Sequence, residues 1–223
     1  MPHQLQHVRI EVSNKVYLKN PESSELGRKI LAHGIEMIDA LGMECFTFRK
    51  LAAAIGTTES ALYRYFENKH KLLLYYVEWY WACLEYELAF GTANLETPED
   101  GLRRAVQIVT RSGEALESDP FDRAQLLRVM VAESSKSFLT KEVDAENRVG
   151  LFAQHKSVCR LLSGLISEVA PSYPHPSSLA SLFLGAHLDQ IYFAAHLPSL
   201  SDAGESEASR YKFFETLIFN TIR

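Results

Sequence analysis

The spacing of hydrophobic positions predicts an almost entirely helical chain. Apolar residues recur every three or four positions, as in the series Leu26, Ile30, Ile38 and Leu41. This spacing places them along one face of an α-helix. Prolines, glycines and small polar residues separate successive segments of this kind, which is typical of loops between helices. We therefore expect an all-α fold of about nine helices.

The first twenty residues follow a different pattern. Apolar and polar residues alternate from Val8 to Val12, and a Ser-Asn pair comes next. Alternation of period two predicts a short hairpin or extended arm over residues 1–20. Such an arm either extends toward an anionic partner or has no such role and simply packs against the body or is mobile. The cations that it would carry are Arg9, Lys15 and Lys19.

Two short helices with a glycine between them are predicted after the first long helix. The first helix begins near the Asn20-Pro21 pair and stops at Gly42. Thr47 is placed to cap a second helix, which Gly56 ends, and Thr58 is placed to cap a third helix reaching about residue 65. This arrangement is typical of a DNA-binding helix-turn-helix.

The third predicted helix is too short to contribute much to a core. Its first turn carries Thr57, Thr58, Glu59 and Ser60, whose small or polar side chains can approach base edges without steric conflict. A fourth helix, with Asn68 as its capping residue, keeps one apolar face from Leu72 for about twenty residues. Because it is so long, this helix is expected to join the head to the body.

Five further helices are predicted in the body. The last two, about 178–197 and 205–222, carry apolar residues on more than one face. A helix of this kind is covered on two sides, and the same pair from a second chain would supply the second covering. The alternative is that both helices are central in one subunit. The residues expected in a dimer interface are Leu182, Ala186, Phe193, Phe214, Leu217 and Ile218.

The charge distribution agrees with a division into an arm at 1–20, a DNA-binding domain at 21–68 and a ligand-binding and dimerisation domain at 69–223. The whole chain has a net charge of −5. Residues 1–75 contain ten Lys or Arg and eight Asp or Glu, whereas the rest contain 13 and 20. The weak basic excess therefore lies at the end that holds the helix-turn-helix.

Composition places the chain among soluble globular proteins. Hydrophobic residues make up 47% of its 223 positions, enough for a core. No segment resembles a membrane span or a signal peptide, so we expect a cytoplasmic protein. Cys45, Cys83 and Cys159 are far apart and stand among apolar residues, which favours reduced core thiols over disulfides.

Candidate catalytic and metal-binding chemistry is sparse. His155 lies four residues before Cys159 and His187 two before Asp189, but neither pair has the third and fourth ligands that a metal site needs. The motifs of nucleophilic hydrolases, phosphate-binding loops and zinc proteases are missing from the sequence. We expect no metal, no cofactor and no enzymatic activity.

A helical body without catalytic residues can still bind a small molecule. Its aromatic side chains favour an apolar or aromatic ligand, although core packing explains each residue taken singly. The candidate lining residues are Trp79, Tyr80, Cys83, Tyr86, Glu133, Phe152, His155, Cys159 and His187.

Residues 46–72 resemble the TetR (tetracycline-repressor-like) family of bacterial transcriptional regulators. The matching positions share the spacing of the family's helix-turn-helix, and the resemblance covers roughly residues 25–75. Three positions differ, since Thr57 stands where the family often has Val, Ala61 where it often has Thr or Ser, and Tyr65 where it often has His. The matching residues are Phe46, Thr47, Leu51, Ala52, Gly56, Leu62, Tyr63, Phe66, Lys69 and Leu72.

The resemblance implies a homodimeric repressor that binds a near-palindromic operator and responds to a small-molecule effector. The rival interpretation is a helical ligand-binding or scaffold protein whose head no longer binds DNA. The operator sequence, the regulated genes and the effector do not follow from the sequence. The expected base contacts are Thr57, Thr58, Ser60 and either Tyr63 or Arg64, and the expected phosphate contacts are Thr47, Tyr63, Tyr65 and Lys69.

Overall fold

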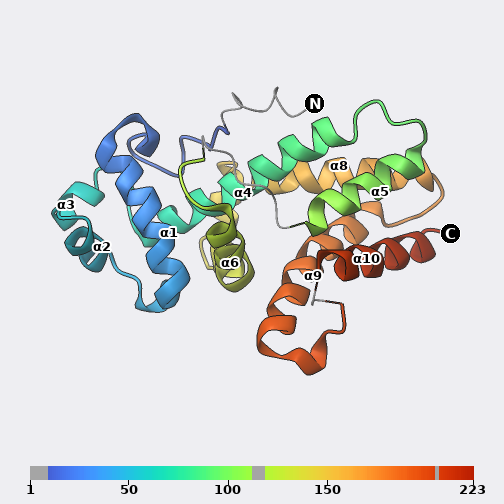
Figure 1. The fold of residues 1–223 in the computed structure, drawn as a ribbon. Coiled ribbons are helices and arrows are strands. Elements are labelled where there is room, and N and C mark those ends of the chain that lie inside the picture. Colours follow the sequence, from blue (N-terminus) through green and yellow to red (C-terminus); the bar gives the residue numbers. More distant parts are fainter. Residues whose placement is uncertain (1–9, 112–118, 204–205) are drawn as a thin grey trace. The chain divides into compact units, whose positions relative to one another are not determined.

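The computed structural model describes residues 10–111, 119–203 and 206–223, and these residues form α-helices and short 3-10 helices without a strand. The all-α prediction is therefore confirmed. Figure 1 shows the elements in chain order. They are η1 (Pro21–Ser23), α1 (Glu25–Cys45), α2 (Phe48–Ala54), α3 (Glu59–Leu62), α4 (Lys69–Gly91), α5 (Pro98–Thr110), α6 (Arg123–Glu133), η2 (Ser134–Ser137), α7 (Val143–Arg148), α8 (Ala153–Val169), α9 (Pro176–His196), η3 (Pro198–Leu200) and α10 (Glu207–Thr221).

Two compact units make up the chain. The first comprises Met1–Ala82 and Gly113–Phe152, and the second Cys83–Ser112 and Ala153–Arg223. Helix α4 contributes its residues up to Ala82 to the first unit and the rest to the second. Compactness thus groups α6 and α7 with the helix-turn-helix. The expected division into an arm, a DNA-binding domain and a ligand-binding domain, with boundaries at residues 20 and 68, is a division by function and stays a prediction.

Helix α1 begins and bends where its sequence indicates. The Ser24 hydroxyl caps it by accepting from the Gly27 backbone N–H at 3.2 Å. Gly42 has a φ of 71°, which interrupts the regular helix four residues before Phe46. The expected stop at Gly42 is therefore a kink, and helical hydrogen bonding resumes up to Cys45. The Phe46 N–H bonds to the Gly42 carbonyl at 3.1 Å across this kink.

The helix-turn-helix follows the prediction closely. Thr47 caps α2 by accepting from the Lys50 N–H at 3.2 Å, and Gly56 has a φ of 69° in the turn, a conformation that favours glycine. Thr58 occupies the cap position of α3, but its side chain makes no capping hydrogen bond. Helix α3 also ends at Leu62, three residues earlier than expected.

The start of α4 is capped as expected, since the Lys71 N–H bonds to the Asn68 side-chain oxygen at 2.9 Å. Several expected helices of the body have different limits. Helix α5 ends at Thr110, although it was expected to reach about residue 118; residues 112–118 lie outside the described residues. The single helix expected over 140–169 is two helices, because Gly150 has a φ of 85° between them.

The N-terminal segment packs against the first unit from residue 10 onward. The Val16 N–H bonds to the Ser13 carbonyl at 3.2 Å, so the expected turn is present, and the Val16 side chain is buried. Among the described residues the segment is not a hairpin, and residues 1–9, including Arg9, lie outside them. Of the two alternatives for the arm, the described part follows packing rather than extension.

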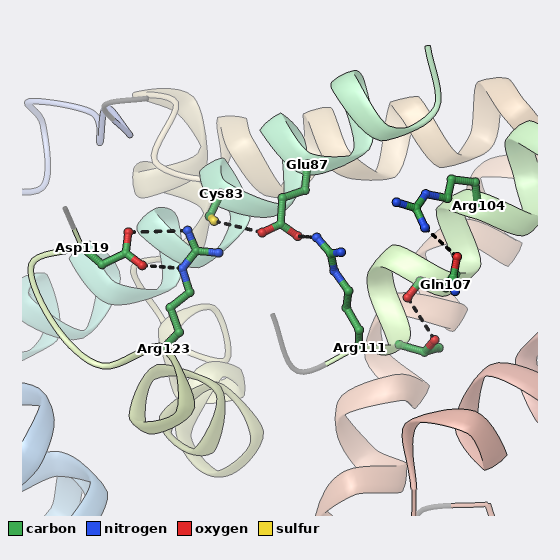
Figure 2. A network of polar contacts seen from close by, with 8 residues as sticks. Cys83, Glu87, Arg104, Gln107, Arg111, Asp119 and Arg123 are labelled. Carbon is green, nitrogen blue, oxygen red and sulfur yellow. Dashed lines mark hydrogen bonds and ion pairs between the residues drawn. The ribbon is translucent and has the colours of Figure 1, made fainter. Parts of the chain in front are cut away.

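Ion pairs join neighbouring helices within the second unit. Figure 2 shows the Glu87 carboxylate at the end of α4, which accepts from Arg111 at 2.9 Å and from the Cys83 thiol at 3.7 Å. Arg103 of α5 pairs with Glu215 of α10. These contacts join the α5 segment to α4 and to α10.

None of the described helices is long and apolar enough to cross a membrane.

Candidate nucleic-acid interface

One surface of the helix-turn-helix gathers most of the expected DNA contacts. Thr47, Thr58, Ser60, Tyr63 and Arg64 are exposed. They come from the starts of α2 and α3 and from the two residues after α3. Because α3 has a single turn, its exposed polar side chains lie close together. Thr57 is only half-buried and also belongs to this surface.

Tyr63 is held in place on this surface by its neighbours. Its ring packs edge-on against Phe48 of α2 with 5.2 Å between the centroids. Its hydroxyl donates to the Glu59 carboxylate at 3.3 Å, one turn back along α3. The ring therefore packs against α2 while 46% of the residue stays exposed. This arrangement suits contact with a phosphate or a base.

Two of the expected phosphate contacts are directed inward. Tyr65 is 4% exposed, and its hydroxyl lies 2.8 Å from that of Ser24. The Lys69 ammonium donates to the carbonyl oxygens of Met43 at 2.6 Å and Phe46 at 3.1 Å. Lys69 therefore caps the carbonyls at the end of α1. Neither side chain is placed to bind a phosphate, which corrects the expectation for both.

Arg49 and Lys50 are further basic residues on this surface, beyond those predicted from the sequence. Both are exposed in the first turn of α2, directly after Thr47. The Lys50 ammonium donates to the Cys45 carbonyl at 2.8 Å. The Arg49 guanidinium, which is also exposed, is therefore the less constrained of the two cations. In the sequence, two adjacent cations shortly after the capping residue Thr47 were the signal that could have identified this basic part of the surface.

The two described basic residues of the arm, Lys15 and Lys19, make their contacts within the first unit. The Lys15 ammonium donates to the Val149 carbonyl at 2.5 Å. Lys19 lies beside Tyr65, with its ammonium 3.5 Å from the hydroxyl and 5.1 Å from the ring centroid. Both cations therefore help to hold the first unit together, and the exposed positive charge of the interface comes from Arg49, Lys50 and Arg64.

Comparison with known proteins agrees with this geometry. Residues 30–76 match the family model described as bacterial regulatory proteins, tetR family. These residues include most of α1, the whole helix-turn-helix and the start of α4. They form a TetR-family DNA-binding domain. No curated protein sequence matches the chain.

Solved structures extend the likeness to nearly the whole chain. A tetR-family regulatory protein from Rhodococcus RHA1 has a TM-score of 0.65 at 15% identity, covering 89% of this chain and 97% of that one. FadR, a fatty acid degradation regulator from Bacillus halodurans, has 0.61 at 16%, covering 87% and 95%. AibR, solved with isovaleryl coenzyme A and operator DNA, has 0.60 at 19%, covering 86% and 98%. The chain therefore has the TetR-like fold, with a helix-turn-helix domain and a larger helical body.

The residues expected to line a ligand pocket are divided between the two units of this TetR-like chain. Trp79, Tyr80, Glu133 and Phe152 belong to the first, and the others to the second. Glu133 has a structural role, because it accepts from the Met43 N–H at 3.3 Å beside the Gly42 kink and pairs with Lys136 at 2.8 Å. It is not placed to bind a ligand, which corrects that expectation.

His187 is the most unusual of the remaining candidates. It lies on α9, is 1% exposed, and has no hydrogen-bond partner at either ring nitrogen among the described residues. Burial and the nearby Arg210 lower its pKa to about 3, so the ring is neutral. Its edge meets Phe214 of α10 with 6.2 Å between centroids, and Arg210 donates to the Thr110 carbonyl at 3.4 Å. Unpartnered polar atoms are uncommon in a core.

The other candidates on α8 do not form a metal site. Burial lowers the pKa of His155 and raises the pKa of the Cys159 thiol. Within the described part of the chain, no three His, Cys, Asp or Glu side chains are placed to hold a metal ion. All three cysteines are free. Cys45 is exposed at the end of α1, so the expectation of a core position was wrong for this residue.

The residues expected in a dimer interface fall on two faces of α9 and α10. Leu182 and Leu217 are 62% and 39% exposed, and Ala186 and Phe193 are half-buried. Phe214 and Ile218 are buried within the second unit, so neither side chain is placed to contact a second chain. Phe213 is exposed next to Leu217, and both line a surface cavity of about 580 Å³ on α10.

Proposed function

We propose that this protein is a ligand-responsive transcriptional repressor that binds a near-palindromic operator as a homodimer. The observation that carries the proposal is the exposed polar and basic surface of α2 and α3 within a TetR-family domain. The one-turn helix α3 presents Thr58, Ser60 and Arg64 together, and a helix of this kind fits the major groove. Thr47 and Arg49 are exposed at the start of α2, and we expect them to contact phosphates.

The exposed apolar residues of the last two helices support the pairing of two chains. Leu182 on α9, and Phe213 and Leu217 on α10, are exposed although they are apolar. A second copy would cover them through a self-complementary interface. Two copies of α3 would then meet successive major-groove segments about 34 Å apart, or a nearby multiple of that distance. A near-palindromic operator follows from the symmetry.

The effector part of the proposal is supported by His187. A neutral imidazole with a free donor and a free acceptor packs against Phe214 and lies near Arg210. A small molecule with an apolar or aromatic body and one polar group would satisfy these atoms. AibR was solved with an acyl coenzyme A, and FadR is a regulator of fatty acid degradation. The fold therefore accommodates regulators linked to acyl compounds.

Control would arise from a shift between two arrangements of the chain. A ligand that binds one arrangement better changes operator affinity by the difference in its binding free energy, typically about 1–3 kcal/mol. Thermal unfolding of the wild-type chain and of His187→Ala, measured against fatty acids, acyl coenzyme A esters and aromatic acids, tests this part. Stabilisation of the wild type alone supports His187, and equal stabilisation of both contradicts it.

DNA binding is tested by selecting duplexes from a random pool with the wild-type chain and measuring affinity by fluorescence anisotropy. Arg64→Ala is expected to weaken binding of the selected duplex about tenfold, as loss of a base or phosphate contact does. Arg104→Ala is the matched control, because Arg104 is an exposed arginine of α5 that bonds to Gln107 of its own helix, as Figure 2 shows. Failure to select any duplex would favour a scaffold or ligand-binding protein.

A further inference from the structure

Tyr65 joins α3 to the N-terminal segment on the side away from the exposed DNA-binding surface. It follows directly after the exposed Tyr63 and Arg64, and its own N–H bonds to the Leu62 carbonyl at 2.8 Å, which closes the last turn of α3. Its ring is almost completely buried behind the DNA-facing surface. Whatever holds Tyr65 therefore also sets the position of α3.

Three polar contacts from residues 18–24 hold Tyr65. The Leu18 N–H donates to the Tyr65 carbonyl at 2.7 Å. The Ser24 hydroxyl lies 2.8 Å from the Tyr65 hydroxyl, and the Lys19 ammonium lies 3.5 Å from it. The bond with Ser24 and the charge of Lys19 lower the pKa of Tyr65 despite its burial. We call this set of four residues, Leu18, Lys19, Ser24 and Tyr65, the Tyr65 brace.

The segment that supplies these contacts is itself fixed at both ends. At one end Lys15 bonds to the Val149 carbonyl and Val16 is buried. At the other end Ser24 caps α1, and Pro21 packs so closely on α1 that a Cβ on Gly27 would lie 2.0 Å from its carbonyl oxygen. Both ends belong to the first unit. The brace thus connects α3 to α1, and Lys15 joins the same segment to the loop after α7.

We infer that the Tyr65 brace sets the orientation of α3, which makes Tyr65 a positioning residue for DNA recognition. This inference rests on the proposed function. A four-residue helix has no stability of its own, so its direction depends on the contacts at its two ends. Base recognition requires side chains to be held to within about 0.5 Å. Residues 15–24 then belong to the DNA-binding machinery although they touch no DNA.

Tyr65→Phe tests the inference because it removes the hydroxyl and keeps the buried ring. Loss of this hydroxyl is expected to weaken binding of the selected duplex about two- to tenfold, the effect of one hydrogen bond. Binding of a scrambled duplex and the salt dependence of affinity are expected to stay unchanged, since no phosphate contact is lost. The double variant Lys19→Met with Tyr65→Phe is expected to lose less binding free energy for the selected duplex than the two single variants lose together, because both changes affect the same contact.

Tyr76→Phe is the matched control. It also removes a buried hydroxyl in the first unit, but this hydroxyl donates to the Leu31 carbonyl of α1 at 2.8 Å and not to α3. Both variants are expected to lose similar stability. Only Tyr65→Phe is expected to lower the ratio between the affinities for the selected and the scrambled duplex. Equal ratios in the two variants would overturn the inference.

Hydrogen exchange without DNA separates failure of the inference from failure of the proposed function. In Tyr65→Phe the amides of residues 59–66 are expected to exchange about two- to tenfold faster than in the wild type, whereas Tyr76→Phe leaves them unchanged. Unchanged exchange in Tyr65→Phe overturns the brace, whatever the DNA results are. If the wild-type chain selects no duplex, the proposed function fails and the role of Tyr65 in recognition fails with it.

Discussion

At the scale of single residues, Lys69 shows how a cation of the helix-turn-helix can serve the fold. Its ammonium is the donor for the carbonyls at the end of α1, next to the kink at Gly42. These carbonyls lack helical partners, and a nearby cation stabilises them. Lys69 therefore holds the start of α4 against the end of α1.

Lys69→Met is expected to lower the free energy of unfolding by about 1–3 kcal/mol, because hydrogen bonds to a charged group are lost. The salt dependence of DNA affinity is expected to stay the same. Arg49→Ala serves as the comparison, since loss of an exposed cation that contacts phosphate reduces the salt slope by about one. Urea unfolding and anisotropy titrations at several salt concentrations measure both effects. A reduced slope in Lys69→Met would contradict the capping role.

The buried neutral imidazole of His187 makes stability depend on pH. Its pKa is about 3 in the folded chain, against about 6.5 for an unperturbed histidine. At a pH well above the unfolded pKa, neither state binds a proton at this site. Between the two pKa values the unfolded chain is protonated and the folded chain is not, so stability falls by up to about 1.4 kcal/mol per pH unit as the pH is lowered.

Urea unfolding at pH 7, 6 and 5 measures this loss, and His187→Leu isolates the contribution of the one side chain. The difference in stability between the variant and the wild type is expected to shift in favour of the variant as the pH falls. If this difference stays constant from pH 7 to pH 5, unfolding does not lead to protonation of His187, which would contradict a buried neutral imidazole in the folded chain.

Local features of this chain could be predicted from the sequence, while the direction of individual side chains could not. Thr47, Gly56 and Asn68 act within three or four residues of their own positions, so spacing was enough to place the caps and the turn. Lys69 and Tyr65 bond to residues 23 and 41 positions away. Sequence shows their charge and polarity but not which distant groups they meet.

At the scale of elements, glycines with positive φ determine where helices bend or divide. Gly42 bends α1 before the helix-turn-helix, and Gly150 separates α7 from α8. The expected single helix over 140–169 was wrong because a hydrophobic pattern continues across Gly150 although the backbone does not. In α10 the hydrophobic pattern is ambiguous in another way, because two apolar faces are present. Positions 213 and 217 lie on the exposed face, and positions 214 and 218 lie on the buried face. Periodicity cannot say which face meets the core.

Gly42→Ala is expected to destabilise the chain by about 1–2 kcal/mol, because a side chain at positive φ is strained. The added Cβ would also lie 3.2 Å from the Glu133 carboxylate. Gly164→Ala in α8 is the control, since nothing lies within 4 Å of its Cβ and its backbone is helical. This control is expected to be stabilised by about 0.4–1 kcal/mol. Thermal unfolding of the two variants against the wild type measures both effects.

At the scale of the whole molecule, the proposed function depends on pairing through α9 and α10. Leu217→Glu is expected to shift the protein toward monomers, because two charges would face each other across a symmetric interface. Leu139→Glu places the same charge at a leucine that is 76% exposed in the first unit and is expected to leave the dimer intact. Light scattering after gel filtration distinguishes the two. A dimeric Leu217→Glu variant would contradict the proposed interface.

Hydroxyl-radical footprinting of the wild-type chain on its selected duplex shows whether two copies of α3 bind one near-palindromic site. We expect two symmetric protected patches separated by one helical turn, about 34 Å, or by a nearby multiple. Arg64→Ala is expected to weaken both patches equally, because each chain contributes the same residue. A single patch, or no protection at concentrations that saturate anisotropy, would contradict binding as a symmetric pair.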